Sequence, residues 1–245
     1  MSRIYLAGAG PGRADLLTVR AARILAKADA VLYDRLVSTE VLDLAPPRAE
    51  RIHVGKEEGR QEEIQARILE MLEDCARRHE TVVRLKGGDP MVFGRGAEEW
   101  LWLARRGWDV ELIPGISSAI AVPALAGIPP TLRGVSGGFA VVTGNRKSGC
   151  CQDWREYASI DTLIILMGVE QRASIARCLI AAGRSPATPA AFVENGTTPR
   201  ERVVVTTLGG IAEGLAEVCA PAVMILGEVV KLREELMPLL ARAIA

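Results

Sequence analysis

One stretch of the chain, residues 84–99, reads Arg84-Leu85-Lys86-Gly87-Gly88-Asp89-Pro90-Met91-Val92-Phe93-Gly94-Arg95-Gly96-Ala97-Glu98-Glu99. The residues that lead into it, Thr81–Leu85, form an apolar run that predicts a buried strand. A helix is predicted to begin near Ala97, because the two acids that follow would stand in its first turn, where the helix dipole favours negative charge. The stretch is therefore interpreted as the turn between a strand and a helix of an α/β sheet.

The residues of this turn suit a close approach to a ligand. Gly87 and Gly88 let the backbone bend sharply, and Pro90 restricts Asp89 to an extended conformation that holds its carboxylate in place. The carboxyl ends of strands are where open α/β sheets bind small molecules. A Gly-Gly pair alone is also typical of a flexible turn that binds nothing, so the binding interpretation depends on the whole stretch.

Composition limits the class of protein. The chain has 245 residues, enough for one large or two medium domains, and 49% of them are hydrophobic, which allows a substantial core. Aromatic residues make up only 4%, which suits aliphatic α/β packing better than a surface that stacks nucleobases. The 30 basic residues balance the 30 acidic ones, and this balance argues against duplex nucleic acid as a partner.

The cysteines indicate a reducing environment. There are 5 of them, with no Cys-x-x-Cys pair, and only 2 histidines, so no metal site is predicted. Cys75 and Cys178 lie in helical patterns and are predicted to be small core residues. We expect a cytoplasmic protein, because free thiols and the lack of a signal peptide favour that compartment. No apolar run approaches the ~18 residues that a membrane span needs.

Strand and helix patterns alternate along the first half of the chain. The predicted strands are Ile4–Ala7, Ala30–Tyr33, Arg51–Val54, Thr81–Leu85 and Val110–Ile113, with a helix over Gln61–His79. This order predicts an N-terminal α/β domain, residues 1–114, whose mostly parallel sheet carries helices on both faces.

The second half, residues 115–245, is predicted to form another α/β domain. Its expected strands are Phe139–Thr143, Thr162–Leu166, Ala190–Val193, Arg202–Thr206 and Ala222–Leu226. The segment Glu194–Pro199, between the third and fourth of these, reads as a turn rather than a helix. It therefore favours a hairpin, and hence a mixed sheet.

A second glycine loop, Gly8-Ala9-Gly10-Pro11-Gly12, follows the first strand. It is similar to the dinucleotide-binding fingerprint, but that motif needs a third glycine where this chain has Arg13. Pro11 also removes an N–H that a pyrophosphate would use. Asp34 could serve as the ribose-binding acid of the same motif. A nicotinamide or flavin enzyme is therefore disfavoured, while a glycine turn without a ligand stays open.

Motifs along nearly the whole chain resemble the tetrapyrrole methylases, and in particular the uroporphyrinogen-III C-methyltransferases. The segment Lys86–Glu99 is similar to the Lys-Gly-Gly-Asp-Pro-x-Val-Phe-Gly-Arg-Gly segment of these enzymes, and Asp34-Arg35-Leu36-Val37 is comparably specific. The Gly-x-Gly-Pro-Gly loop is shared across the superfamily and is less specific. Further similar motifs are Val54-Gly55-Lys56, Pro114–Ser118, Gly127–Pro129, Met167-Gly168, Val193–Pro199 and Gly227–Val230.

This resemblance implies a fold, a reaction and partners. The expected fold has two α/β domains with a cofactor cleft between them, and the expected assembly is a homodimer. The expected reaction converts uroporphyrinogen III to precorrin-2 by two successive methylations from S-adenosylmethionine, with S-adenosylhomocysteine as product, early in sirohaem and cobalamin biosynthesis. The resemblance implies no nucleic acid, membrane or metal as a partner.

The resemblance also implies which positions form the site. The cofactor is expected to contact Pro11, Gly87, Gly88, Asp89, Val92, Ser117, Ser118, Met167 and Gly196. Asp34 is similar to the family's proposed general base and Lys56 to its proposed acid partner. Each of these two charges is also typical of an ordinary surface or ion-paired residue. A methyl transfer needs alignment above all, and a base removes the proton that must later leave the macrocycle.

The substrate carries many carboxylates, so its site is expected to contain cations, and arginine suits bidentate contacts with carboxylates. The loop cations near the presumed cleft are Arg35, Arg60, Arg95, Arg133, Arg146 and Lys147. Substrate contacts are predicted for Arg35, Arg95 and Arg133, although each cation taken alone is more typical of a solvated surface charge than of a ligand.

The chain departs from the family pattern in the segment Leu132–Ser136 and in a shortened loop after Lys56. These departures bear on substrate binding more than on the fold. They leave two alternatives: a methylase for a later corrin intermediate, and a sensor or scaffold that binds an adenosine ligand. Asp34 and Lys56 argue against the second alternative, because a protein that only binds has no need of a base.

Overall fold

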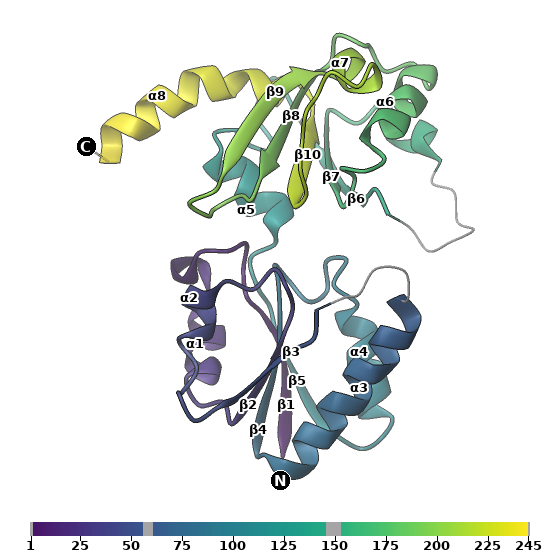
Figure 1. Cartoon of the computed structure of the whole chain (residues 1–245). Helices are drawn as coiled ribbons and strands as arrows, with labels where there is room; N and C mark the ends of the chain where they lie inside the picture. Colours follow the sequence, from purple (N-terminus) through teal and green to yellow (C-terminus); the bar gives the residue numbers. More distant parts are fainter. Residues whose placement is uncertain (1, 56–60, 146–152, 245) are drawn as a thin grey trace. The chain divides into compact units, whose positions relative to one another are not determined.

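The computed structural model describes residues 2–55, 61–145 and 153–244. The chain divides into two compact units, Met1–Ser117 and Ser118–Ala245, coloured from purple to teal and from teal to yellow in Figure 1. The boundary predicted from the sequence lies after Pro114, between the last strand of the first unit and the first helix of the second. Each unit is described by itself below.

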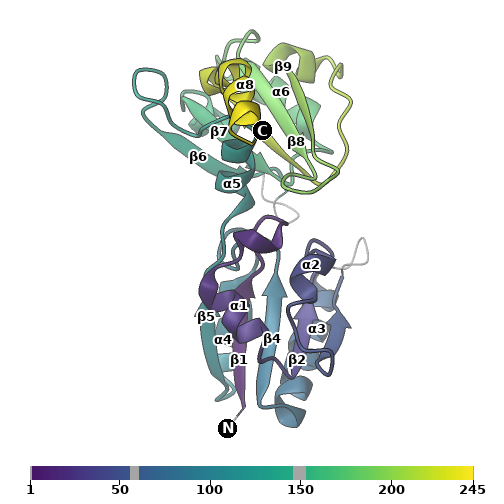
Figure 2. The ribbon, with the colours of Figure 1, turned by 90° about the vertical axis from the view of Figure 1, so that its left-hand side faces the viewer.

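The first unit contains a five-stranded sheet in which neighbouring strands are parallel, in the order β3-β2-β4-β1-β5. Its strands are β1 (Arg3–Gly8), β2 (Ala30–Tyr33), β3 (Glu50–His53), β4 (Thr81–Lys86) and β5 (Asp109–Ile113). Figure 2 shows β5, β1, β4 and β2 side by side. The central strands β1, β2 and β4 are apolar runs because both faces of the sheet are covered.

Helices cover both faces of this sheet (Figure 1). The 3-10 turn η1 (Ala14–Leu16) precedes α1 (Val19–Leu25), and α1 and α2 (Thr39–Leu42) pack with Val31, Val83 and Leu85. On the other face, α3 (Gln61–Arg78) and α4 (Gly96–Ala104) pack with strand side chains that include Leu6 and Leu32. Hydroxyl oxygens cap the two short helices, since Thr18 accepts from the N–H of Ala21 and Ser38 from that of Val41.

The second unit contains a five-stranded mixed sheet in the order β6-β7-β10-β8-β9. Its strands are β6 (Phe139–Thr143), β7 (Thr162–Leu166), β8 (Pro189–Glu194), β9 (Arg202–Thr207) and β10 (Ala222–Leu226). Only the pair β6–β7 is parallel, and the other neighbouring strands are antiparallel. The prediction of a parallel sheet followed by a mixed sheet is confirmed, and so is the hairpin between β8 and β9.

Two apolar clusters hold the second unit together, one on each face of its sheet. The helical elements are α5 (Ser118–Leu125), η2 (Trp154–Tyr157), α6 (Arg172–Ala181), α7 (Leu208–Ala212), η3 (Glu228–Lys231) and α8 (Leu232–Ile244). Helices α6 and α7 pack on one face, and α5 packs on the other (Figure 1).

The cysteine prediction is half right. Cys75 is buried in α3, as expected. The prediction for Cys178 is wrong, because α6 turns Ile175, Ala176 and Leu179 towards the core and leaves Cys178 exposed. Within the described residues, no helix is both long and apolar enough to cross a membrane.

Candidate active site

The carboxyl ends of the parallel strands gather several predicted site residues at one edge of the first sheet. The loop after β1 contains Pro11, the loop after β2 contains Asp34 and Arg35, and the loop after β4 contains the segment Gly87–Arg95. Because β2, β4 and β1 are neighbours in the sheet, these three loops emerge next to one another. The loop that follows β5 ends at Ser117.

Three glycines bring the backbones of these loops into direct contact. A Cβ on Gly8 would lie 2.5 Å from Cα of Gly115, and a Cβ on Gly115 would lie 2.3 Å from the carbonyl oxygen of Gly88. The loops after β1 and β4 also pair directly, since Gly88 N donates to Gly10 O over 2.8 Å and Gly10 N to Gly88 O over 3.2 Å. We call this meeting point of Gly8, Gly10, Gly88 and Gly115 the glycine corner. The N–H groups of Gly10 and Gly88 bond to the protein's own backbone and hold the two loops together.

Asp89 braces the same corner with its side chain. Its Oδ1 accepts from the N–H of Met91 over 2.7 Å, and its Oδ2 accepts from the N–H of Gly115 over 2.9 Å. The loop then closes onto α4, where Gly96 N donates to Pro90 O over 2.9 Å. The sequence predicted that the Asp89 carboxylate is held in place, and the structure shows the two N–H groups that hold it.

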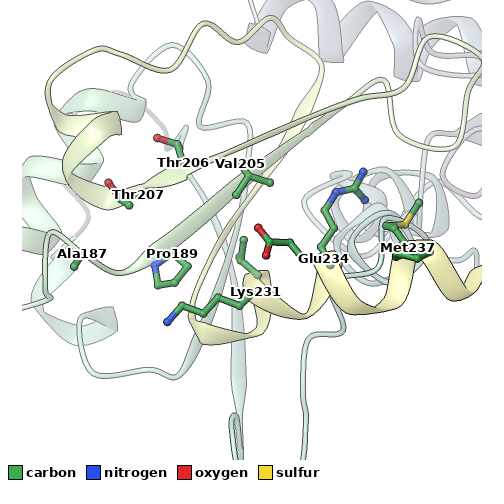
Figure 3. A pocket seen from close by; sticks show the side chains of 11 residues that line it. Ala187, Pro189, Val205, Thr206, Thr207, Lys231, Glu234 and Met237 are labelled. Carbon is green, nitrogen blue, oxygen red and sulfur yellow. The ribbon is translucent and has the colours of Figure 1, made fainter.

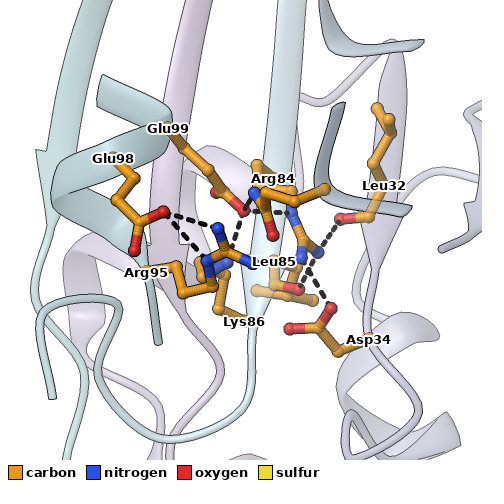
Figure 4. Close-up of polar contacts among 9 residues, drawn as sticks. Leu32, Asp34, Arg84, Leu85, Lys86, Arg95, Glu98 and Glu99 are labelled. Atoms are coloured by element: carbon orange, nitrogen blue, oxygen red, sulfur yellow. Dashed lines mark hydrogen bonds and ion pairs between the residues drawn. The ribbon is translucent and has the colours of Figure 1, made fainter. Parts of the chain in front are cut away.

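Asp34 lies directly after β2 and is held from the neighbouring strand. Nη2 of Arg84, a residue of β4 that is only 2% exposed, donates to Oδ1 of Asp34 over 2.6 Å (Figure 4). The Asp34 side chain is 31% exposed, so the carboxylate stands between the buried guanidinium and the outside of the unit. Its predicted partner Lys56 lies outside the described residues, and so do Arg60, Arg146 and Lys147.

The three predicted substrate arginines have different surroundings. Arg35 is exposed in the loop after β2. Arg95 precedes α4 with φ +60° and forms an ion pair with Glu98, 2.6 Å between Nη2 and Oε2. Arg133 belongs to the second unit and is exposed in a tight turn that Ser136 N closes by donating to Leu132 O over 2.8 Å. Arg35 and Arg95 therefore flank the same sheet edge, whereas Arg133 lies in the other unit.

Apolar side chains also stand exposed in the site loops, and the sequence analysis did not single them out. Leu36 follows Arg35, and its Cβ would lie 3.1 Å from a Cβ added to Gly87. Met91 and Phe93 are exposed in the glycine loop after β4, and Phe93 has φ +52°. A bulky aromatic residue inside a polar glycine loop is the signal that could have identified this position, because an exposed Phe in a turn needs a reason.

In the second unit, two of the three predicted cofactor positions lie at one helix, α5. Ser118 is the first residue of α5, and Gly196 packs against the same helix, since a Cβ there would lie 2.4 Å from Cγ1 of Val122. The next residue, Thr197, has φ +67°, and its buried Oγ1 has no hydrogen-bond partner among the described residues. An unpartnered buried hydroxyl is rare in folded proteins and marks a place for a further polar group.

Met167 lies at the same end of the second sheet as Gly196, because β10 pairs Met224 with Ile165 of β7 and Ala222 with Glu194 of β8. It follows β7 with φ +55°, and the residue is 49% exposed. A methionine that serves only as a core residue is normally buried. The conformation instead presents the thioether at the surface of the unit. Together with the loops of the first unit, these positions remain predictions for contacts with a cofactor.

One cavity in the second unit contains none of the predicted site residues. It has a volume of about 470 Å³ and lies between the strands β8 and β9 and the helix α8. Figure 3 shows Val205 and Pro189 on one side of it and Glu234 and Met237 on the other. Mostly apolar groups face this space, so it offers few of the directed polar contacts of a small-molecule site.

Comparison with known proteins gives one family and several relatives. The sequence model of the Tetrapyrrole (Corrin/Porphyrin) Methylases matches residues 3–212. A uroporphyrinogen-III C-methyltransferase of Synechocystis sp. is 41% identical over 253 residues, which cover 98% of this chain and 95% of that protein. A siroheme synthase of Stutzerimonas stutzeri is 46% identical over 240 residues, which cover 96% of this chain. The chain spans about half, 52%, of the length of that synthase.

A solved structure with the same architecture contains a ligand. The uroporphyrin-III C-methyl transferase of Thermus thermophilus, complexed with S-adenyl homocysteine, superposes with a TM-score of 0.84 and is 49% identical. The similarity covers 94% of this chain and 94% of that one.

Proposed function

Because the chain belongs to the tetrapyrrole (corrin/porphyrin) methylases, we propose that it is an S-adenosylmethionine-dependent C-methyltransferase. Its substrate is uroporphyrinogen III, and its product is precorrin-2, formed by two successive methylations early in sirohaem and cobalamin biosynthesis. S-adenosylhomocysteine is the other product. The observation that carries this proposal is the match to the Synechocystis uroporphyrinogen-III C-methyltransferase, because the match covers 95% of that protein.

Features of each unit support a nucleoside cofactor. In the first unit, the loops after β1, β4 and β5 pack backbone to backbone at Gly8, Gly88 and Gly115, which fixes the strand ends that carry the predicted contacts. In the second unit, Thr197 carries a buried hydroxyl without a hydrogen-bond partner among the described residues, next to the predicted contact Gly196. The predicted contacts Pro11, Val92, Ser117 and Ser118 belong to the same loops and helix start.

The cofactor supplies a methyl group that its sulfonium already activates. The protein therefore has to hold the acceptor carbon in line, which is catalysis by positioning. The glycine corner and the two hydrogen bonds of Asp89 fix the loop after β4, which would hold the acceptor carbon in line. Asp34 accepts the proton that leaves the macrocycle, and the contact from Arg84 fixes the direction of its carboxylate. Lys56 is proposed as the acid partner.

The loop side chains also suit the substrate. Arg35 and Arg95 provide cations for the acidic side chains of the tetrapyrrole. Leu36, Met91 and Phe93 provide exposed apolar surface at the same sheet edge, which suits the flat apolar face of a macrocycle. Arg133 of the second unit is proposed as a further contact.

The assembly and the location are also proposals. A homodimer and a cytoplasmic location rest on the family resemblance and on the cysteine content. The mass of the pure protein in solution, measured by light scattering, tests the dimer directly, and a monomer at working concentration would contradict it.

The first experiment is an anaerobic incubation of the pure protein with S-adenosylmethionine and freshly generated uroporphyrinogen III, followed by mass spectrometry. The expected result is a product with two added methyl groups and release of S-adenosylhomocysteine. If the protein binds S-adenosylhomocysteine but adds no methyl group, the proposed substrate is wrong. Later corrin intermediates are then tested next, because the Leu132–Ser136 segment departs from the family pattern.

A further inference from the structure

A group of charged side chains is buried in the first unit behind Asp34. Glu99 of α4 is 0% exposed, and Arg84 and Lys86 of β4 are 2% and 3% exposed. Oε1 of Glu99 accepts from Lys86 Nζ over 2.7 Å and from Gln65 Nε2 of α3 over 2.9 Å. Figure 4 shows Glu99, Lys86 and Arg84 converging between α4 and β4. One carboxylate therefore joins two helices to the central strand.

Arg84 connects this buried carboxylate to Asp34. Its Nε lies 3.6 Å from Oε1 of Glu99, and its Nη2 donates to Oδ1 of Asp34 over 2.6 Å. Its Nη1 donates to the carbonyl oxygens of Leu85 over 3.2 Å and Leu32 over 3.4 Å. Hydrogen bonds therefore orient the planar guanidinium towards Asp34 and the two carbonyl oxygens, while its Nε faces Glu99 in an ion pair, with no hydrogen bond among the described residues.

The charges in this group balance. Arg84 and Lys86 are cations, and Glu99 and Asp34 are anions. Burial lowers the pKa of the Lys86 ammonium, and the positive charge of Arg84 lowers it further. Without the charge of Glu99, the two cations would have Asp34 as their only carboxylate in the group. Arg84 would then lose the opposite charge that faces its Nε, so Asp34 alone would balance it.

We propose that Glu99 is a positioning residue for methyl transfer: it fixes the Arg84 guanidinium, and Arg84 in turn fixes the carboxylate of Asp34. The inference rests on the proposed function, in which Asp34 is the base. A buried ion group is by itself weak evidence for stability, because well-packed apolar residues often do as well. These buried charges do more than fill the core, because they connect Glu99 in the core to Asp34, a partly exposed site residue.

A double-mutant cycle tests this with the full-length protein. The four proteins are the wild type, Glu99→Gln, Asp34→Asn and the double variant, and the readouts are kcat, the Kd of S-adenosylhomocysteine and the thermal midpoint. Glu99→Gln is expected to lower kcat by between about tenfold and about 100-fold, the effect of a misplaced reacting group, with the Kd unchanged within about twofold. In the Asp34→Asn background it is expected to cause no further loss of kcat, because coupled residues are not additive.

Two further variants separate positioning from damage to the fold. Glu50→Gln is the matched control, because Glu50 accepts from Arg78 over 2.9 Å at the opposite end of the same sheet. It is expected to lower the thermal midpoint and to leave the kcat of the folded protein unchanged. If Glu99→Gln does not fold, Gln65→Leu takes its place, since Gln65 touches Glu99 and its removal keeps all four charges. It is expected to lower kcat less, with the same lack of additivity.

The outcomes are distinguishable. A wild type that transfers no methyl group overturns the proposed function, and the inference with it. Asp34→Asn with wild-type kcat removes Asp34 from the mechanism and overturns the inference while methyl transfer stands. Additive losses in the cycle, or an equal loss of cofactor affinity in Glu99→Gln, overturn the inference alone, because both indicate general damage.

Discussion

The backbone N–H of Gly115 donates a hydrogen bond to Oδ2 of Asp89 over 2.9 Å, which ties the loop after β5 to the loop after β4. The other oxygen of the same carboxylate accepts from Met91 N over 2.7 Å. One side chain thus satisfies two loop N–H groups that belong to no helix or strand. These two loops of the first unit are therefore tied together without a ligand.

Asp89→Ala is expected to lower both the stability and the cofactor affinity. It leaves the Gly115 N–H without its acceptor in a half-buried place, which costs about 1–3 kcal/mol in the free energy of unfolding. Urea denaturation measures this loss, and calorimetric titration with S-adenosylhomocysteine measures the affinity. Asp89→Asn is the matched variant, because its single oxygen can keep one of the two contacts, and an intermediate loss is expected. An Ala variant with wild-type affinity would show that the brace is not needed for binding.

Gly115→Ala is expected to disrupt the glycine corner. The new Cβ would lie 2.3 Å from the carbonyl oxygen of Gly88, and both backbones are held, since Gly115 N donates to Asp89 and Gly88 pairs with Gly10. Overpacking of this kind costs about 1–3 kcal/mol or more, and binding of S-adenosylhomocysteine is expected to be lost. Gly138→Ala is the control, because a Cβ there meets nothing within 4 Å and the backbone is not left-handed. Thermal unfolding of both variants, together with calorimetric titration of each, checks the contrast; equal effects would contradict it.

The fold could be predicted from the sequence because its strands are continuous apolar runs. Each of the ten strands was expected within one or two residues of its observed bounds, and the hairpin followed from the turn at Glu194–Pro199. Such runs are readable because burial on both faces favours apolar residues, although β4 still contains the buried Arg84 and Lys86. The failure at Cys178 has the complementary cause. Helix α6 is short, and its apolar residues are spread around the helix. Their spacing therefore did not reveal which face is buried.

The site was predictable only in part, because its decisive contacts join residues far apart in the chain. Glu99 was interpreted as an acid that favours a helix start, whereas it is the buried partner of Lys86 and lies beside Arg84. Arg84 was interpreted as one residue of an apolar strand. Nothing local marks either as part of a network, since the partners lie 13 to 50 residues apart in the sequence. Asp34 was predicted from the family motif, and the residue that holds it was not.

Arg95→Ala is expected to weaken tetrapyrrole binding more than cofactor binding. The variant loses a cation at the site edge, and a charge-assisted contact with a carboxylate is worth about 1.5–3 kcal/mol, or roughly tenfold to 150-fold in Kd. Titration with uroporphyrin III, the stable oxidised form of the substrate, measures this loss beside the Kd of S-adenosylhomocysteine. Glu98→Gln is the control, because it removes an ion partner of Arg95 and keeps the cation. Equal losses of both ligands in Arg95→Ala would indicate a structural role at the start of α4.

Glu194→Gln is expected to remove stability that depends on pH. The Glu194 carboxylate accepts from Arg202 Nε over 2.7 Å and from Cys219 N over 2.6 Å, and the residue is buried. The Arg202 contact, with a smaller contribution from the Cys219 N–H, holds the pKa of Glu194 below its usual 4.5. A carboxyl group whose pKa is lower in the folded state stabilises the protein above its unfolded pKa, and this stabilisation is lost as the pH falls through the folded value.

The variant should therefore be less stable than the wild type near neutral pH, by about 1–3 kcal/mol, because the amide leaves one of the donors unsatisfied. Half of the Arg202 side chain is exposed, so solvent screens its ion pair, and the Cys219 N–H contact is partly buried. The difference should shrink as the pH falls below about 4.5. Urea denaturation of both proteins across this range measures it.

Glu213→Gln, at an exposed carboxylate after α7, should differ from the wild type by less than about 0.5 kcal/mol at every pH. If the difference in the free energy of unfolding between Glu194→Gln and the wild type stays constant at low pH, Glu194 contributes through packing rather than through its charge.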